Sequence, residues 1–253
     1  MRSKLAQVTR RIARLVDRLR GLGVVNHGGA GVIGFIDVGS AGQLPAPWYR
    51  HSAEISYALK FEPRDSRQVA RYVRTVDAAL WSEATERDFF VYRGLAASGS
   101  SLFEQNTQYV RENFAELSTR GPRHLAETWL ERSELDHVET VGCRTLDQVL
   151  AEDSNRYHFL KIDAQGAEFE ILQGASTFLE RDCLGLHLEL FTVPLYKGIR
   201  LRGEVEHFLA DLGFSLVKEY PPHGSFDSQN DCVFLRRGAG GVEVDAIRRI
   251  YGL

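Results

Sequence analysis

Hydrophobic residues in this chain form short continuous runs that are separated by polar and glycine-containing segments. Three of these runs, at residues 32–39, 55–63 and 157–163, have an acidic residue at or near their end. Continuous apolar runs of this length are typical of strands that are buried on both faces of a parallel sheet. Because helical patterns alternate with these runs, we expect an α/β fold with a mostly parallel sheet and helices on both faces.

The other segments predict shorter elements and one long excursion from the sheet. We expect a buried strand at residues 184–191 and a mostly helical insertion at about residues 101–137. The remaining predicted elements are helices at residues 66–73 and 202–214, strands at residues 75–80 and 87–94, and a closing hairpin of strands at residues 215–220 and 231–238. This hairpin adds an antiparallel strand to one edge of the sheet.

The start of the chain differs from the rest in charge and in the spacing of its apolar residues. Residues 1–20 carry seven basic side chains and one acidic side chain, and their apolar residues recur at helical spacing. We therefore expect a basic amphipathic helix at residues 1–22. It packs on the domain, packs on a second subunit in a homodimer, or makes a peripheral contact with an anionic membrane. An α/β domain at residues 23–238 and a C-terminal tail at residues 239–253 follow.

The composition excludes some partners and locations. The 253 residues carry a net charge of −3, which gives no reason to expect a nucleic-acid partner. No apolar run approaches the roughly 20 residues that span a bilayer, and the charged N-terminus lacks the apolar segment of a secretory signal. Three widely separated cysteines, Cys143, Cys183 and Cys232, are expected to be reduced thiols. We therefore predict a soluble, cytoplasmic protein.

Ligands of open parallel sheets bind beyond the carboxyl ends of the strands, so polar residues at those ends are site candidates. The segment "IDVGSAG" places Asp37 and Gly39 at one such end, and its glycines let the backbone approach a ligand closely. Glu62 ends the next strand, where an acid can accept hydrogen bonds from both hydroxyls of a ribose. The predicted cofactor contacts are Asp37, Gly39, Ser40, Gly42, Glu62, Asp77 and Ala78.

The chemistry of the first glycine turn indicates which cofactor binds there. The turn is not a GxGxxG motif, which disfavours a nicotinamide-dependent reductase. It also lacks the Lys and Arg residues that would favour a pyrophosphate. A cationic ligand with a ribose fits this acidic turn better, and S-adenosyl-L-methionine carries a sulfonium, an ammonium group and a ribose diol. We therefore predict S-adenosyl-L-methionine as the cofactor.

A second group of polar residues follows the later strands. Asp163 ends the strand in "LKIDAQGAEFE", and Glu189 and His187 share one face of the next strand. A carboxylate that ends a buried strand is costly without partners, which favours a functional role. We predict Asp163, Glu189 and His187 as catalytic residues that accept or orient a substrate proton, without a metal. The alternatives are a core role for His187, a divalent metal between the two acids, and a helix-start role for Glu168.

The predicted insertion is a candidate lid or substrate wall, because long excursions from compact α/β domains are often functional. Its aromatic residues Tyr109, Phe114 and Trp129 could stack on a sugar ring. Their helical spacing favours core packing for at least two of them.

Several segments occur in an order that resembles the FkbM family of S-adenosylmethionine-dependent methyltransferases. These segments are "IDVGSAGQLP", "FEP", "SSLF", "TLDQVL", "LKIDAQGAEFEILQGA" and "ELFTVPLYKG", and they cover roughly residues 35–237. The resemblance implies a class I, Rossmann-like methyltransferase fold with a mostly parallel seven-stranded sheet and one antiparallel strand near an edge. It also implies O-methylation of a hydroxyl on a sugar, a glycan or a polyketide-type product.

The sequence departs from the family pattern at two places. The segment "GSAGQLPAPW" replaces the more usual Ala-Asn-x-Gly turn, which implies a different hold on the methionine end of the cofactor. Gln165 stands where many members have a glutamate, which removes a third acid that a metal site would need. The altered turn leaves open a second function, a catalytically inactive binding or scaffold protein with the same fold. No residue of the sequence identifies the acceptor molecule.

Overall fold

The computed structural model of the chain describes residues 29–39, 42–62, 70–94 and 98–253. The predicted N-terminal helix at residues 1–22 and Ser40 lie outside the described residues. The membrane contact and the homodimer that this helix suggests therefore stay predictions.

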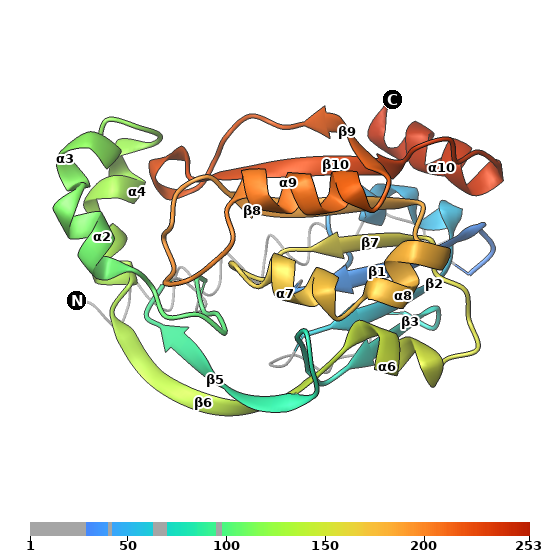
Figure 1. Ribbon diagram of the computed structural model, residues 1–253, viewed down its shortest axis with the longest axis horizontal. Coiled ribbons are helices and arrows are strands. Elements are labelled where there is room, and N and C mark those ends of the chain that lie inside the picture. The colour runs from blue at the N-terminus through green and yellow to red at the C-terminus, as the bar shows by residue number, and fades with distance from the viewer. Residues whose placement is uncertain (1–28, 40–41, 63–69, 95–97) are drawn as a thin grey trace.

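Seven strands form the main sheet, with a second, smaller sheet beside it (Figure 1). The strand order of the main sheet is β3 (Val73–Val76), β2 (Ile55–Phe61), β1 (Ile33–Val38), β7 (Phe159–Ile162), β8 (Gly185–Phe191), β10 (Gln229–Arg236) and β9 (Phe214–Glu219). Strand β10 is antiparallel to both of its neighbours, and the pairs from β3 to β8 are parallel. The predicted mostly parallel sheet is confirmed, and its antiparallel strand lies near an edge, as the family resemblance implies. The hairpin alone had indicated that this strand would be the edge strand itself.

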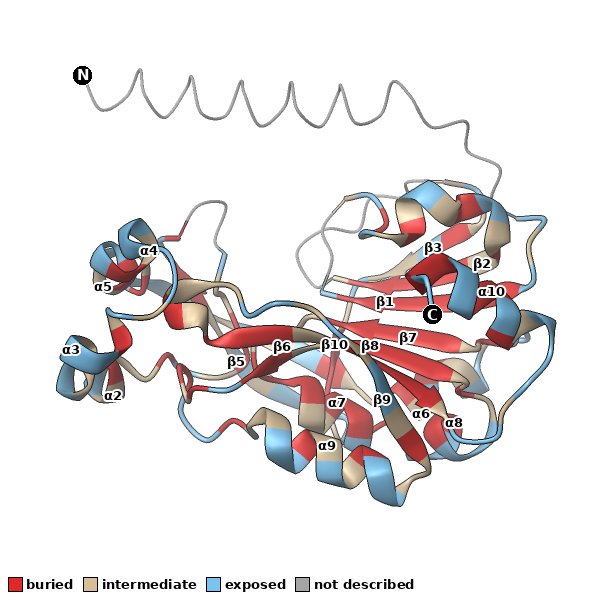
Figure 2. Cartoon of the chain, turned by 90° about the horizontal axis from the view of Figure 1, so that it is seen from above, coloured by how far each residue is buried: buried red, intermediate tan, exposed pale blue. Residues whose placement is uncertain are grey.

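The apolar runs of the sequence correspond to strands that are covered on both faces. Every residue of β1 and of β7 is buried, as Figure 2 shows for the centre of the sheet. On one face lie α6 (Leu146–Ala151), α7 (Glu168–Gln173), α8 (Ser176–Arg181) and α9 (Arg202–Asp211), and on the other lie the 3-10 helix η1 (Trp48–Glu54) and α10 (Val242–Tyr251) (Figure 2). Continuous burial is what a parallel sheet between two helical layers requires.

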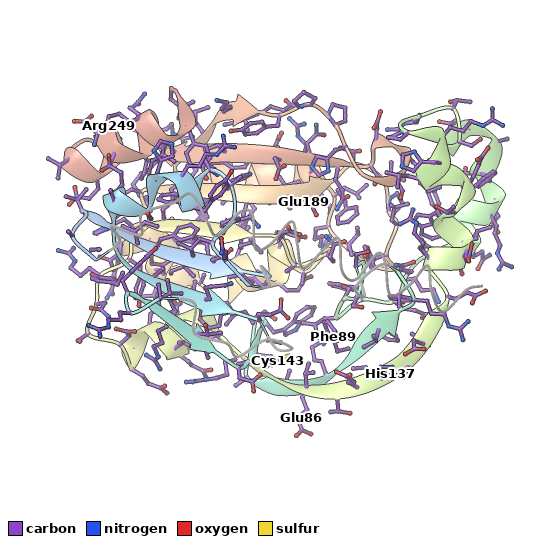
Figure 3. All side chains as sticks on the ribbon, turned by 180° about the vertical axis from the view of Figure 1, so that it is seen from behind. Glu86, Phe89, His137, Cys143, Glu189 and Arg249 are labelled. Atoms are coloured by element: carbon purple, nitrogen blue, oxygen red, sulfur yellow. The ribbon has the colours of Figure 1, made fainter. Side chains whose placement is uncertain are left out.

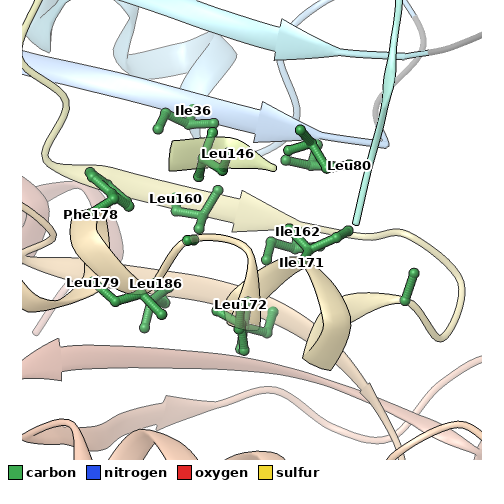
Figure 4. Packing of buried hydrophobic residues seen from close by; sticks show 14 of the residues in the cluster. Ile36, Leu80, Leu146, Leu160, Ile162, Ile171, Leu172, Phe178, Leu179 and Leu186 are labelled. Atoms are coloured by element: carbon green, nitrogen blue, oxygen red, sulfur yellow. The ribbon is translucent and has the colours of Figure 1, made fainter. Parts of the chain in front are cut away.

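Two separate hydrophobic clusters hold these layers together. In the first, strand residues such as Ile36, Leu160 and Leu186 pack against the helices α6 to α8 (Figure 4). In the second, α10 and η1 cover the opposite face through Tyr251 and Trp48, whose indole Nε1 donates to the Tyr251 hydroxyl at 2.9 Å. The segment at residues 239–253, predicted as a C-terminal tail, contains helix α10, whose buried side chains belong to this second cluster.

The segment "TLD" has a structural role at the start of two helices. The Thr145 hydroxyl accepts a hydrogen bond from Gln148 N, and the Gln148 side chain accepts one from Thr145 N, which forms a capping box for α6. The Asp147 carboxylate accepts hydrogen bonds from the backbone N–H groups of Thr177 and Phe178, at the start of α8. These contacts join two helices of one layer.

The region between β3 and β7 differs from the prediction in detail. Residues 66–69 of the predicted helix at residues 66–73 lie outside the described residues, and its last residue, Val73, begins β3. The predicted strand at residues 75–80 is divided between β3 and β4 (Ala79–Leu80). Strand β4 belongs to the second sheet, whose order is β4, β6 (Leu135–Arg144) and β5 (Thr85–Tyr92). The curved pair β5–β6 carries the insertion at its end, with Phe89 toward the body of the protein and Glu86 pointing away (Figure 3).

The insertion contains four short helices. They are α2 (Thr107–Glu112), α3 (Phe114–Leu117), α4 (Arg123–Glu127) and α5 (Trp129–Arg132). Val110, Leu117 and Trp129 pack on Phe226 in η3 (Ser225–Asp227) and on the segment after β8. Trp129 is thus a core residue, as helical spacing predicts. The insertion is held over the carboxyl edge of the main sheet by this third cluster.

Two further observations concern the cysteines and the helices of the described residues. Cys143, Cys183 and Cys232 are buried and free. Within the described residues, no helix combines the length and the apolar character that crossing a membrane would need.

Candidate active site

Most of the predicted site residues emerge at one edge of the main sheet because five strands are in register there. One row across these strands consists of Val76, Phe61, Val38, Ile162 and Leu188. The residues that follow this row are Asp77, Glu62, Gly39, Asp163 and Glu189. Parallel strands deliver their next residues to the same edge, so residues from five separate segments become neighbours at this rim.

Gly39 fixes the turn after β1 against the turn after β7. Its φ is +86°, and a Cβ atom at this position would lie 1.8 Å from the carbonyl oxygen of Asp163. The Gly39 N–H donates to Phe61 O at 3.0 Å, and the Asp163 N–H donates to Val38 O at 3.1 Å. Only glycine allows both the left-handed backbone and this approach of two turns.

The remaining predicted cofactor contacts lie around this turn. Glu62 and Ala78 are half-buried, Asp77 is exposed, and Gly42 has a positive φ of +77° with open space at its Cβ position. Asp37, in contrast, is fully buried inside β1 rather than exposed in the turn. Glu62, Asp77, Ala78 and Gly42 thus lie at the carboxyl edge of the main sheet, as predicted, and their contact with a cofactor stays a prediction.

Two buried lysines flank Asp37 in the neighbouring strands. Lys60 and Lys161 are both its register partners, and each is nearly inaccessible. The Lys60 Nζ donates to Gly42 O at 2.5 Å. Burial alone would lower the pKa of Lys161, but the charges of Asp163, Asp37 and other acids raise it overall. The buried carboxylate is therefore compensated by cations that the sequence pattern did not indicate.

Gln165 joins two of the predicted catalytic carboxylates. Its Nε2 donates to Asp163 Oδ1 at 3.0 Å and to Glu189 Oε2 at 2.9 Å. The Tyr196 hydroxyl donates to Gln165 Oε1 at 3.1 Å, and the Ser101 hydroxyl donates to the Gln165 carbonyl at 2.7 Å. The structure thus brings Asp163 and Glu189 together on one amide. Figure 3 labels Glu189, which lies on β8 in the main sheet.

The two carboxylates differ in their surroundings. The Asp163 side chain is 34% exposed, and its Oδ2 lies 3.4 Å from Lys161 Nζ. The Glu189 side chain is 13% exposed, and its Oε2 accepts a second hydrogen bond, from Gln229 Nε2 at 2.6 Å. Burial raises the pKa of Glu189 well above its usual range, and the charges of Asp163 and Glu168 raise it further. A carboxyl group of this kind can exchange protons closer to neutral pH than an exposed one.

His187 has both of its ring nitrogens engaged. Its Nδ1 is 3.0 Å from the Tyr251 hydroxyl, and its Nε2 is 3.0 Å from Asp231 Oδ1. The imidazole is buried, which matches the core alternative, and its role as an assisting base stays a prediction. Burial would raise the pKa of Asp231, but the hydrogen bond from His187 and nearby positive charges lower it overall.

Glu168 closes the turn between β7 and α7. It is buried, its Oε1 accepts from Ala164 N at 2.8 Å, and its Oε2 accepts from Gly166 N at 3.0 Å. Burial raises the pKa of this carboxyl group to about 8. The structure therefore supports the helix-start role for Glu168.

Sequence reasoning missed several polar residues next to the rim. Asp231 is the register partner of Glu189 in β10, and His223 Nε2 lies 3.2 Å from Asp231 Oδ2 and 3.8 Å from Glu189 Oε1. Their proximity depends on the register of an antiparallel pair, which the sequence does not show. Within the described residues, no group of three His, Cys, Asp or Glu side chains could hold a metal ion.

The mostly parallel seven-stranded sheet with helices on both faces is that of a class I, Rossmann-like methyltransferase fold, as predicted. The model of the methyltransferase FkbM domain matches residues 43–216, more than half of the chain, so the chain belongs to the FkbM methyltransferase family. One similar solved structure is methyltransferase FkbM from Methylobacillus flagellatus KT, with 10% sequence identity and a TM-score of 0.45. The match covers 85% of this chain and 45% of that chain, so this chain spans less than half the length of that protein. No curated protein matches the chain.

Proposed function

We propose that this methyltransferase transfers a methyl group from S-adenosyl-L-methionine to a hydroxyl of a sugar, a glycan or a polyketide-type product. The observation that carries this proposal is the pair of carboxyl groups, Asp163 and Glu189, held on Gln165 at the rim. An alcohol is a poor nucleophile at neutral pH, so it needs a group that accepts its proton. A carboxylate beside the methyl donor fits this need.

The residues around the first turn fit the proposed cofactor. Glu62 directly follows β2, whose last residue, Phe61, accepts a hydrogen bond from Gly39 N, and its carboxylate can accept hydrogen bonds from the two ribose hydroxyls. Asp77, Glu62 and Asp163 place negative charge along the rim, which suits the sulfonium and the ammonium group. When bound, S-adenosyl-L-methionine supplies an electrophilic methyl group.

The protein itself would orient the acceptor and move its proton. Asp163 is the more exposed carboxylate, and Lys161 and Gln165 each hold one of its oxygens. It is therefore positioned to accept the hydroxyl proton. Glu189 accepts from the same Gln165 amide and so helps to hold that amide against Asp163. Alignment of the acceptor oxygen with the methyl group contributes much of the rate, because the reaction is an in-line displacement.

The test is the substitution Asp163→Asn, assayed with S-adenosyl-L-methionine and a panel of hydroxylated acceptors. Loss of the proton acceptor should lower turnover by about 10² or more, in the range of general-base contributions. Cofactor binding, measured by calorimetry, should be retained. Asp211→Asn, on the exposed end of α9, is the matched control and should keep full activity.

Two outcomes would contradict the proposal. Full activity of the Asp163→Asn protein would exclude the proton-accepting role. A wild-type protein that does not bind S-adenosyl-L-methionine in the calorimeter would instead indicate a binding or scaffold protein with this fold.

A further inference from the structure

A cavity of about 240 Å³ lies beside the Asp163–Gln165–Glu189 group. Gln165 and Gln229 line it, and the amides of both residues donate to Glu189. Helix α5 of the insertion contributes another part of the wall. This volume is below the roughly 300–1,000 Å³ of most ligand pockets, so it suits a single ring or a short chain. The cavity is therefore placed and sized to hold the acceptor end of a substrate.

The lining of the cavity is neutral apart from one arginine. Among the described residues that line it, Arg132 is the only one with a permanent charge. Its Nη2 donates to Leu125 O at 2.8 Å and to the Ser225 hydroxyl at 2.9 Å, and its Nε donates to the Thr128 hydroxyl at 3.2 Å. Every one of these acceptors is neutral. Burial lowers the pKa of the Arg132 guanidinium, because water no longer fully solvates the charge.

The absence of a counterion distinguishes Arg132 from an arginine of the preceding helix. Arg123, in α4, is exposed and forms an ion pair with Glu127 at 2.6 Å. Within the part of the chain that the structure describes, no carboxylate oxygen lies within 4.0 Å of the Arg132 guanidinium nitrogens. Its Nη1 group has no hydrogen-bond acceptor among the same residues and remains available. A partly buried cation without a counterion is a strong recognition element for an anion.

Gln105 supplies a second, independent indication that the cavity binds a ligand. Its side chain lines the cavity, and the residue is only 7% exposed. The amide Nε2 donates to Gly99 O at 3.3 Å, whereas the Oε1 has no hydrogen-bond partner among the described residues. A buried acceptor without a partner costs free energy, which a hydroxyl group of a ligand would recover.

We propose that this cavity binds a hydroxylated acceptor with an anionic group, either a carboxylate or a phosphate ester. Arg132 holds the anion, and Gln105 accepts a hydrogen bond from a hydroxyl of the same molecule. The inference rests on the proposed function, since it specifies the acceptor for that site. It favours an acidic sugar unit or a small hydroxy acid over a neutral, apolar polyketide.

The experiment measures binding of three probes to the full chain by calorimetry: glucuronic acid, glucose 6-phosphate and glucose. Because a hydrogen bond to a charged group is stronger than one to a neutral group, one or both anionic probes should bind at least about tenfold more tightly than glucose. The two anionic arms distinguish a carboxylate site from a phosphate site. Arg132→Gln should abolish the preference, and Arg123→Gln, the exposed control, should keep it.

Arg132→Lys separates charge from structure. Lysine keeps the positive charge, so this variant should retain part of the preference, whereas loss of the hydrogen bonds to Leu125 and Ser225 would affect both variants alike. If the melting temperature shows that Arg132→Gln does not fold, the inference is tested on two other proteins. The wild type must then prefer an anionic probe over glucose, and Arg132→Lys must retain part of that preference. Equal binding of the three probes, no binding of any of them, or a preference that survives Arg132→Gln would overturn the inference. Calorimetry with S-adenosyl-L-methionine tests the proposed function separately, so the two can fail independently.

Discussion

At the residue scale, Gln165 determines how the two rim carboxylates are arranged. Its φ is +52°, a region that non-glycine residues seldom adopt, at a cost of order 1–3 kcal/mol. Hydrogen bonds to Asp163 and Glu189, together with those from Tyr196 and Ser101, hold the residue in this conformation. An amide fits between two carboxylates because its N–H groups can donate to both.

The substitution Gln165→Glu tests this arrangement. A third carboxylate would replace two donated hydrogen bonds with repulsion, so we expect the free energy of unfolding at pH 7 to fall by roughly 1–3 kcal/mol. Three neighbouring carboxylates also favour a hard cation. The melting temperature of this variant should therefore rise on addition of Mg²⁺ or Mn²⁺, measured by calorimetry.

The control for this substitution is Gln173→Glu, on the exposed end of α7. It introduces the same charge away from the rim and should change neither stability nor the response to metal. Wild-type stability in Gln165→Glu, with no response to either cation, would show that the amide does not separate the carboxylates.

At the element scale, the site depends on two turns that touch through backbone atoms. Gly39→Ala would force a Cβ to within 1.8 Å of the Asp163 carbonyl oxygen and would also strain a φ of +86°. Gly42→Ala is the matched control, because its φ of +77° carries the same strain while its Cβ would meet open space. We expect about 1–2 kcal/mol of destabilisation for Gly42→Ala, and clearly more for Gly39→Ala, in urea denaturation. Equal losses would mean that the turns can separate freely.

The elements that could be predicted well are the buried strands, because burial on both faces requires mostly apolar residues. Strands β1, β7 and β8 lie between two helical layers, so nearly all of their residues are buried and most of them are apolar. Strand β6 was missed because most of its residues are exposed, and its sequence "LDHVETVGCR" contains no apolar run. Its pairing with β5 joins segments separated by four helices, which local patterns do not reveal.

The site residues also divide into those that a local pattern predicts and those that depend on the pairing of distant segments. Asp163 and Glu62 were predicted because they follow strands that share one edge, and Glu189 because it lies in the neighbouring strand beside that edge. Lys161 lies inside a buried run, and Asp231 lies in an antiparallel strand, so their proximity to the rim depends on register. The strand ends could thus be predicted from the sequence, but the partners that neutralise and orient them could not.

At the scale of the whole molecule, burial of acidic groups at the site should make folding stability depend on pH. Burial raises the pKa of Glu168 to about 8, and it raises the pKa values of Glu189 and Glu170 as well. In an unfolded chain a glutamate has a pKa near 4.3. Between these values the folded protein binds more protons than the unfolded chain, so stability falls as the pH rises from about 4.3 to 8.

We therefore expect the wild-type protein to be less stable at pH 8.5 than at pH 5.5, as measured by urea denaturation at both values. One fully shifted group changes the free energy of unfolding by at most about 1.4 kcal/mol per pH unit within this window. Glu168→Gln removes the titrating group, so its slope with pH should be smaller than that of the wild type. At pH 5.5 it should already be less stable by about 1–3 kcal/mol, because an amide cannot accept from both Ala164 N and Gly166 N.

Glu180→Gln, in the exposed part of α8, removes a carboxyl group of the same type without touching the site, and its slope should equal that of the wild type. The two variants together separate the buried group from the general loss of one negative charge. A wild-type protein whose stability is constant or rises between pH 5.5 and 8.5 would contradict the raised pKa values. If the free energy of unfolding of Glu168→Gln depends on pH as steeply as that of the wild type, the dependence must come from other buried acids such as Glu189. Protonation of Glu189 would then link folding stability to the rim where methyl transfer is proposed.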